Sequence, residues 1–136
     1  MNLNLQAQPR EHSVFLEKFE DGSVYFAAKK QWPENAAKSL SWAKLQKRQR
    51  PLVAKYLKFD GQSSRQQLAT KLSKKEAELM KSSLIRNSVL MGDNNLNIIK
   101  ETDVDLSDGR VSAIQRYCKC GYNRAVELVE LFNAIK

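Results

Sequence analysis

Residues 111–132 read VSAIQRYCKCGYNRAVELVELF, and this stretch carries the clearest structural signal in the chain. Ser112 can cap a short helix, whose apolar residues share one face at helical spacing: Ile114, Tyr117 and Cys118. Gly121 suits a turn that needs a positive φ, and Tyr122 begins a second helix. The spacing predicts a buried stripe on that helix, formed by Ala125, Leu128, Val129, Phe132 and Ile135. A short helix, a glycine turn and a longer helix make a helix-turn-helix, which can place its second helix in the DNA major groove.

The segments Ser112-Ala-Ile-Gln-Arg116 and Gly121-Tyr-Asn-Arg-Ala125 resemble the gamma domain of FtsK-type bacterial DNA translocases. The hallmark of that domain, a winged helix that reads an oriented DNA sequence, is roughly S-x-I-Q-R-x-F-x-I-G-Y-N-R-A. Cys118 replaces its phenylalanine and Cys120 its isoleucine, and both replacements are small and apolar. The resemblance covers only residues 111 to about 133. It therefore implies a helix-turn-helix without the rest of the gamma domain.

The resemblance implies roles for individual side chains. Asn123 and Arg124 would open the recognition helix, and Glu127 would sit one turn further on, where it could accept from a cytosine amino group. Arg116 and Lys119 would flank that helix as phosphate contacts. The residue types suit these roles, because Arg pairs with guanine and Asn with adenine through two hydrogen bonds each. The alternative is that these residues merely start a helix in a packing unit.

Basic charge is concentrated in one part of the chain. The 136 residues carry 23 Lys and Arg against 15 Asp and Glu, a net charge of +8, which points to a polyanionic partner. Residues 29–58 alone hold nine basic residues and one acidic residue, whereas residues 88–109 hold one and five. The densest run predicts a phosphate-contacting surface, with a solvated helix face as the alternative: Lys44, Lys47, Arg48, Arg50, Lys55 and Lys58.

The N-terminal and middle segments predict further elements. Alternating apolar residues on both sides of Asp21-Gly22 predict a hairpin in which Val14, Leu16 and Phe19 face Val24 and Phe26. Pro33 and Pro51 suggest helix starts. Ser64 could cap a helix over residues 65–72, and Ser73 with Glu76 forms a capping box for a third helix. Residues 88–91 and 96–99 read as a second hairpin. Helices followed by a hairpin suggest a winged helix over residues 51–100, with a plain small α+β unit as the alternative.

Several kinds of chemistry are not expected. The five glycines never form a G-x-x-x-x-G-K-[ST] phosphate loop, so the translocase motor is absent and we assign no reaction and no cofactor. Cys118 and Cys120 lack the ligand number and spacing of a zinc site, so core packing is the better interpretation. Asp103, Asp105 and Asp108 lack the calcium-loop pattern and suggest a solvated loop. No membrane span or secretory signal is found, and cysteine usage indicates a reducing cytoplasm.

The sequence therefore predicts a mainly helical α+β protein in four segments: an N-terminal hairpin plus basic helix (1–50), a possible winged-helix-like unit (51–100), an acidic loop or linker (101–110) and a helix-turn-helix (111–136). We expect a sequence-specific duplex-DNA-binding protein of bacterial, plasmid or phage type, nucleoid-associated and homodimeric. It would act as a transcriptional regulator or as an accessory factor in DNA transfer or partition. Two alternatives stay open: an interaction adaptor, or an RNA binder that uses the basic 44–58 segment with Trp32, Trp42 and Tyr56 for stacking.

Overall fold

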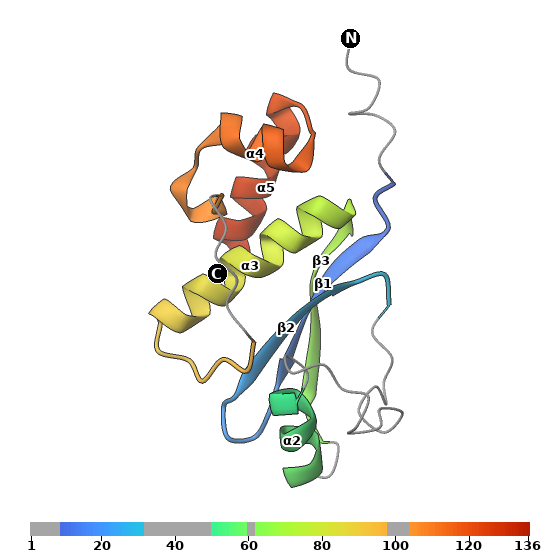
Figure 1. Ribbon diagram of the computed structural model, residues 1–136, viewed down its shortest axis with the longest axis vertical. Helices are drawn as coiled ribbons and strands as arrows, with labels where there is room; N and C mark the ends of the chain where they lie inside the picture. The colour runs from blue at the N-terminus through green and yellow to red at the C-terminus, as the bar shows by residue number, and fades with distance from the viewer. Residues whose placement is uncertain (1–8, 32–49, 60–61, 98–103) are drawn as a thin grey trace.

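In the part of the chain that the structure describes, a three-stranded antiparallel sheet and four α-helices form an α+β fold (Figure 1). The computed structural model describes residues 9–31, 50–59, 62–97 and 104–136. The strands are β1 (His12–Lys18), β2 (Val24–Lys29) and β3 (Ser64–Leu72), in the spatial order β2-β1-β3. The helices are α2 (Arg50–Lys58), α3 (Lys74–Leu90), the 3-10 turn η3 (Leu106–Asp108), α4 (Val111–Cys118) and α5 (Tyr122–Ile135). Among the described residues, no helix has the length and apolar character needed to cross a membrane.

The expected N-terminal hairpin is confirmed. β1 pairs with β2 so that Leu16 lies opposite Phe26. Gly22 takes the positive φ of +86° that the turn requires, and the Asp21 carboxylate accepts a hydrogen bond from the Ser23 N–H at 2.9 Å. Phe19 was expected to join the hairpin core, but it packs instead with Leu52 of α2 in a second, smaller apolar cluster.

The helix expected over residues 65–72 is wrong, because this segment is strand β3 and pairs with β1 along its length. The spacing of Ala69 and Leu72 resembles a helical stripe, yet both are buried against the sheet's helical layer through a β-bulge. Val14 pairs with Ala69 and His12 with Leu72, so β3 contains one extra residue there. Because of the bulge, the apolar residues of this strand have a spacing that is also typical of a helix.

Helix α3 begins with the predicted capping box, in which Ser73 and Glu76 exchange side-chain and backbone hydrogen bonds. Residues 88–91 do not form the first strand of the expected second hairpin, because α3 continues through Ser88 to Leu90. Part of its second strand, residues 98 and 99, lies outside the described residues. Gly92, at a φ of +85°, marks the end of the helix. In the described part of residues 51–100 the order is thus helix, strand, helix, which is not the order of a winged helix.

The two C-terminal helices are confirmed, with two local corrections. The residue with a positive φ in the turn is Lys119, at +53°, whereas Gly121 has a φ of −76° and is the N-cap of α5. Ser112 does not cap α4, since the N-cap position is Arg110 and no side chain bonds there. Lys119 thus tolerates the left-handed conformation that the sequence analysis assigned to glycine.

One hydrophobic core contains side chains from the hairpin, β3, α3, η3, α4 and α5. The four segments expected from the sequence therefore pack together in the described part of the chain. Its most buried large side chains include Leu72, Met80, Ile114 and Phe132. The expected acidic loop is docked from residue 104 onward: Leu106 is 1% exposed and its N–H donates to the Ser83 hydroxyl at 3.0 Å. Figure 1 shows α3 across the sheet, with α4 and α5 beside its N-terminal half.

Candidate nucleic-acid interface

The first turn of α5 is open to solvent on one side. The Tyr122 side chain is 62% exposed, and Asn123 is also exposed. Gly121 supplies no side-chain cap, so the first backbone N–H groups of α5 have no capping acceptor from that residue. A Cβ placed at Gly121 would meet no atom within 4 Å. A ligand phosphate could therefore approach these N–H groups, to which the helix dipole also attracts negative charge.

Arg124, the expected guanine reader, is held by the protein itself. Its Nε donates to Glu76 Oε2 at 2.9 Å, and its NH2 donates to Glu76 Oε1 at 3.0 Å. NH2 also donates to the Lys71 carbonyl at 3.1 Å, and NH1 donates to Glu127 Oε2 at 3.1 Å. Only 21% of the Arg124 side chain is exposed. The structure thus places Arg124 as a link between α5 and α3, with Glu127 as its outer partner.

Glu76 is the acceptor at the centre of this arrangement, and its side chain is 2% exposed. Burial alone would raise the pKa of Glu76, but hydrogen bonds from Arg124 and from the Ser73 N–H, with the nearby charge of Arg10, hold that pKa below its usual value. Arg10 Nε lies 3.8 Å from Oε1. One carboxylate therefore ties the start of α3, the start of α5 and the segment before β1 together.

The bulge in β3 contributes to the same arrangement. Lys71 has a φ of +56°, a left-handed conformation that costs a non-glycine residue about 1–2 kcal/mol. The Lys71 carbonyl accepts the hydrogen bond from Arg124 NH2. The sheet edge and the first turn of α5 are thereby joined across 53 positions of sequence.

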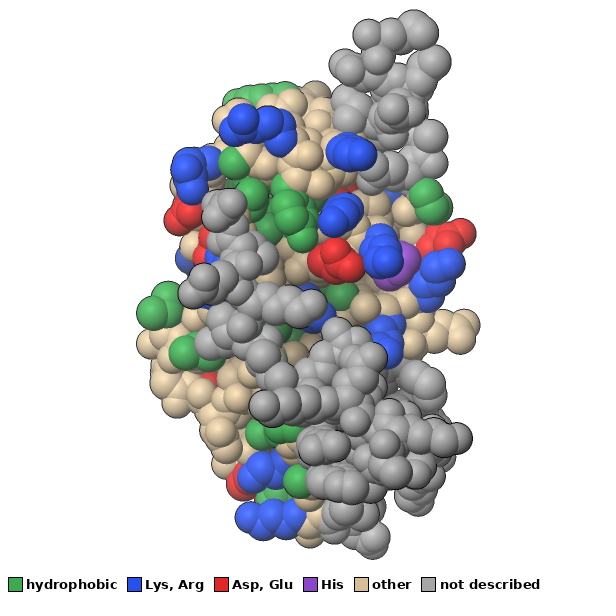
Figure 2. All heavy atoms as spheres, viewed as in Figure 1, with side chains coloured by type: hydrophobic (Ala, Val, Ile, Leu, Met, Phe, Trp, Pro, Cys, Tyr) green, Lys and Arg blue, Asp and Glu red, His purple; other side chains and the backbone are tan. Residues whose placement is uncertain are grey.

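Exposed basic side chains surround this end of the molecule. Arg116 and Lys119, the expected phosphate contacts, are both exposed beside the α4–α5 turn. Lys75 Nζ lies 5.2 Å from the centre of the Tyr117 ring, which brings the start of α3 next to α4. Figure 2 shows several Lys and Arg side chains on this part of the surface. Arg10, Lys71 and Lys75 were not predicted as site residues, because nothing in their local sequence reveals which element they will face.

Most side chains of the basic run expected to contact phosphates lie outside the part of the chain that the structure describes. Lys44, Lys47 and Arg48, with Trp32 and Trp42, lie outside the described residues, as do the side chains of Arg50 and Tyr56. Lys55 is described, and its Nζ pairs with Asp21 Oδ2 at 2.6 Å. The hydrogen bond from Lys55, with those from Ser23, lowers the pKa of Asp21. Lys55 therefore links α2 to the β1–β2 turn.

The two cysteines lie in the core, as predicted. Cys118 is 1% exposed and Cys120 is 4% exposed. Burial raises the pKa of the Cys118 thiol to about 12 and also raises that of Cys120. No group of three or more potential metal ligands is found in the described part of the chain. Both thiols therefore act as small apolar side chains in this structure.

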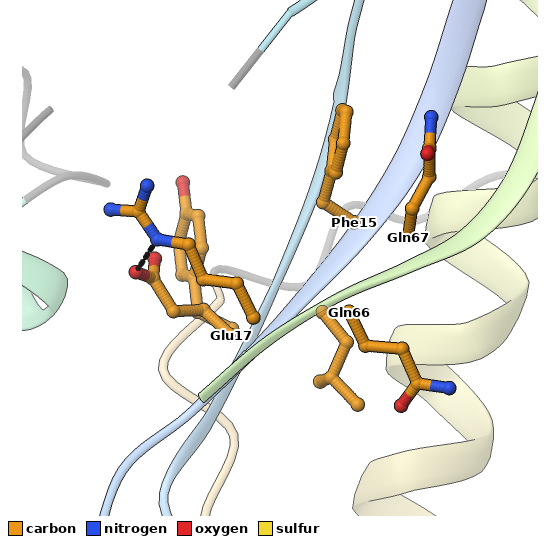
Figure 3. Close-up of a pocket in the computed structure, with 7 residues that line it drawn as sticks. Phe15, Glu17, Gln66 and Gln67 are labelled. Atoms are coloured by element: carbon orange, nitrogen blue, oxygen red, sulfur yellow. Dashed lines mark hydrogen bonds and ion pairs between the residues drawn. The ribbon is translucent and has the colours of Figure 1, made fainter. Parts of the chain in front are cut away.

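A hollow of about 280 Å³ lies on the sheet face that is turned away from α3 (Figure 3). Glu17 and Phe15 of β1, with Gln67 of β3, stand on this face, whereas Gln66 points to the other side. The Glu17 side chain is 2% exposed, and its Oε1 accepts from Arg65 Nε at 2.7 Å. This ion pair depends on the register between β1 and β3 and so could not be predicted from local sequence. The lining combines apolar, amide and charged groups, and it does not select one class of ligand.

No family model, curated protein or solved structure matches this chain.

Proposed function

We propose that this protein binds duplex DNA, with sequence preference, through the α4–α5 turn and the first turn of α5. The observation that carries the proposal is the open first turn of α5, with exposed Tyr122 and Asn123, next to exposed Arg116 and Lys119. Helix N-terminal N–H groups and basic side chains are the groups that proteins direct to phosphates. An exposed Asn at the same place offers both a donor and an acceptor to a base edge.

The charges on α5 favour an end-on approach. Glu127 and Glu130 are exposed further along the helix, where a DNA backbone would be repelled by their carboxylates. Arg116 and Lys119 lie beside its N-terminal end. The helix spans about 20 Å, so its two ends lie in different electrostatic surroundings. We therefore propose that its N-terminal end enters the major groove, while its C-terminal part stays outside.

The biological setting is part of the same proposal. A single short recognition helix rarely supplies enough contacts, so we propose a homodimer that reads two half-sites. We propose a cytoplasmic, nucleoid-associated protein that acts in transcriptional regulation or as an accessory factor in DNA transfer or partition. The proposal does not include a winged helix, because β3 stands where a helix of that fold was expected.

Charge reversal tests the proposal. Binding of labelled random-sequence duplexes would be measured by fluorescence anisotropy over a range of salt concentrations. The double variant Arg116→Glu/Lys119→Glu should bind at least ten-fold more weakly, and its salt slope should fall by about 2 because two phosphate contacts are lost. The matched control is Lys136→Glu, at the far end of α5. Equal losses in both variants, or no duplex binding by the unaltered protein, would contradict the proposal, and preference for unpaired RNA would favour the RNA-binding alternative.

A further inference from the structure

The bond between Glu76 and Arg124 bears on which base the first turn of α5 can read. We propose that Glu76 is a positioning residue: it withdraws Arg124 from the DNA surface, so that Asn123 alone makes the base contact there and favours adenine. This inference rests on the proposed DNA binding and states which base the bound surface prefers.

The donors of Arg124 are almost fully used. A guanidinium has five N–H donors. In this structure Nε gives one to Glu76, NH2 gives one to Glu76 and one to the Lys71 carbonyl, and NH1 gives one to Glu127. Four donors are engaged, and one on NH1 is left. Recognition of guanine through O6 and N7 needs two donors from the same guanidinium. Arg124 can therefore read guanine in this way only if it breaks a bond it already makes.

The bond to Glu76 is also the hardest of these to break. Glu76 is 2% exposed, and removal of its partner would leave a buried carboxylate short of donors. The capping box prevents Glu76 from following Arg124 outward, because Oε1 also accepts from the Ser73 N–H at 2.9 Å. The bond to Glu127 is different, because Glu127 is 62% exposed and can be solvated by water. Arg124 is thus held on its inner side.

The side chain of Asn123, unlike that of Arg124, is available to contact a base. Its side chain is exposed, and it makes no side-chain hydrogen bond within the described part of the chain. An Asn amide pairs with adenine by donating to N7 and accepting from the N6 amino group. Asn123, the neighbour of Arg124 on the first turn of α5, therefore offers both the donor and the acceptor that adenine requires.

The test compares base preference in variants of the full chain. Bound sites would be selected from a random duplex pool, and the affinity for the best site would be compared with sites carrying G·C in place of each A·T pair. Glu76→Gln keeps an acceptor for the capping box but loses the charge that holds Arg124. It should shift preference toward guanine by about five-fold or more at one position. The matched control, Glu78→Gln, makes the same charge change on α3 and should leave the preference unaltered.

Two further variants keep the test decisive. Glu76→Gln/Arg124→Met should lose the gained guanine preference, which ties the gain to Arg124 rather than to loosening of the fold. If Glu76→Gln fails to fold, Arg124→Met alone provides the test. Its adenine preference should stay within two-fold of that of the unaltered protein. A ten-fold loss of base preference in Arg124→Met, or an unchanged preference in folded Glu76→Gln, would overturn the inference without affecting the proposed function. Absence of duplex binding in the unaltered protein would end the proposed function itself.

Discussion

The Glu76 carboxylate receives two hydrogen bonds from Arg124, at 2.9 and 3.0 Å, although the two residues are 48 positions apart in the chain. This pair fixes the first turn of α5 against the first turn of α3. The same bond therefore withdraws Arg124 from the surface and links the start of α5 to the start of α3.

Replacement of Arg124 should mainly affect stability. Arg124→Ala would leave the buried Glu76 carboxylate without its charged partner, which should lower the free energy of unfolding by about 3 kcal/mol. Urea denaturation followed by circular dichroism would measure it. Glu127→Gln, which removes only the exposed outer contact, should cost less than about 1 kcal/mol. Similar stabilities for Arg124→Ala and the unaltered protein would show that the pair does not hold the two helices together.

The same pair predicts a pH dependence. The pKa of Glu76 is lower in the folded protein than its ordinary value of 4.5, so the folded state binds fewer protons at this residue than the unfolded state. The resulting stabilisation is complete above about pH 4.5 and is lost as the pH falls from there through the lowered pKa. Glu76→Gln should therefore show a shallower loss of stability below pH 4.5 in urea titrations at several pH values. Parallel curves for the two proteins would contradict this assignment.

The cysteines should resist modification in the native state. Cys118 is 1% exposed with a pKa of about 12, and the thiolate is the reactive form, so at pH 8 alkylation should proceed far more slowly than for a free thiol. Addition of urea above the unfolding midpoint should restore the ordinary rate. Mass spectrometry of iodoacetamide-treated protein would report both residues. Rapid native labelling of Cys118 would show that the core opens around α4.

The left-handed conformation of Lys71 predicts a stabilising substitution. Lys71→Gly should raise the free energy of unfolding by about 1 kcal/mol, because glycine adopts a φ of +56° without steric cost. Its backbone carbonyl would still accept from Arg124. Lys74→Gly, in the first turn of α3, serves as the opposite case and should destabilise the protein. A decrease in thermal stability for Lys71→Gly would mean that the lysine side chain contributes more than the strain it imposes.

Local features of the sequence predicted local structure well. The Asp21-Gly22 turn and the Ser73–Glu76 capping box involve residues at most three positions apart, and both form as expected. The α4–turn–α5 region also follows from local periodicity. In each case the deciding interactions lie within one turn of the chain.

The remaining structure depends on residues far apart in sequence. β3 is a strand because β1 offers it a partner, and the bulge at Lys71 gives it apolar spacing that also fits a helix. The pairing of Glu76 with Arg124 has no local sign, because a Glu three residues after a Ser already has a role in a capping box. The sequence therefore marked Arg124 as a residue type suited to binding DNA, but it could not show that Glu76 is its hydrogen-bond partner.

The most direct test of DNA binding by this surface is a ¹⁵N–¹H correlation spectrum recorded during titration with a duplex recovered by selection. If this surface binds DNA, the shifts should be concentrated at Arg116, Lys119 and residues 121–123, with little change in β1 and β2. Shifts confined to the sheet, or none at a saturating duplex concentration, would contradict it.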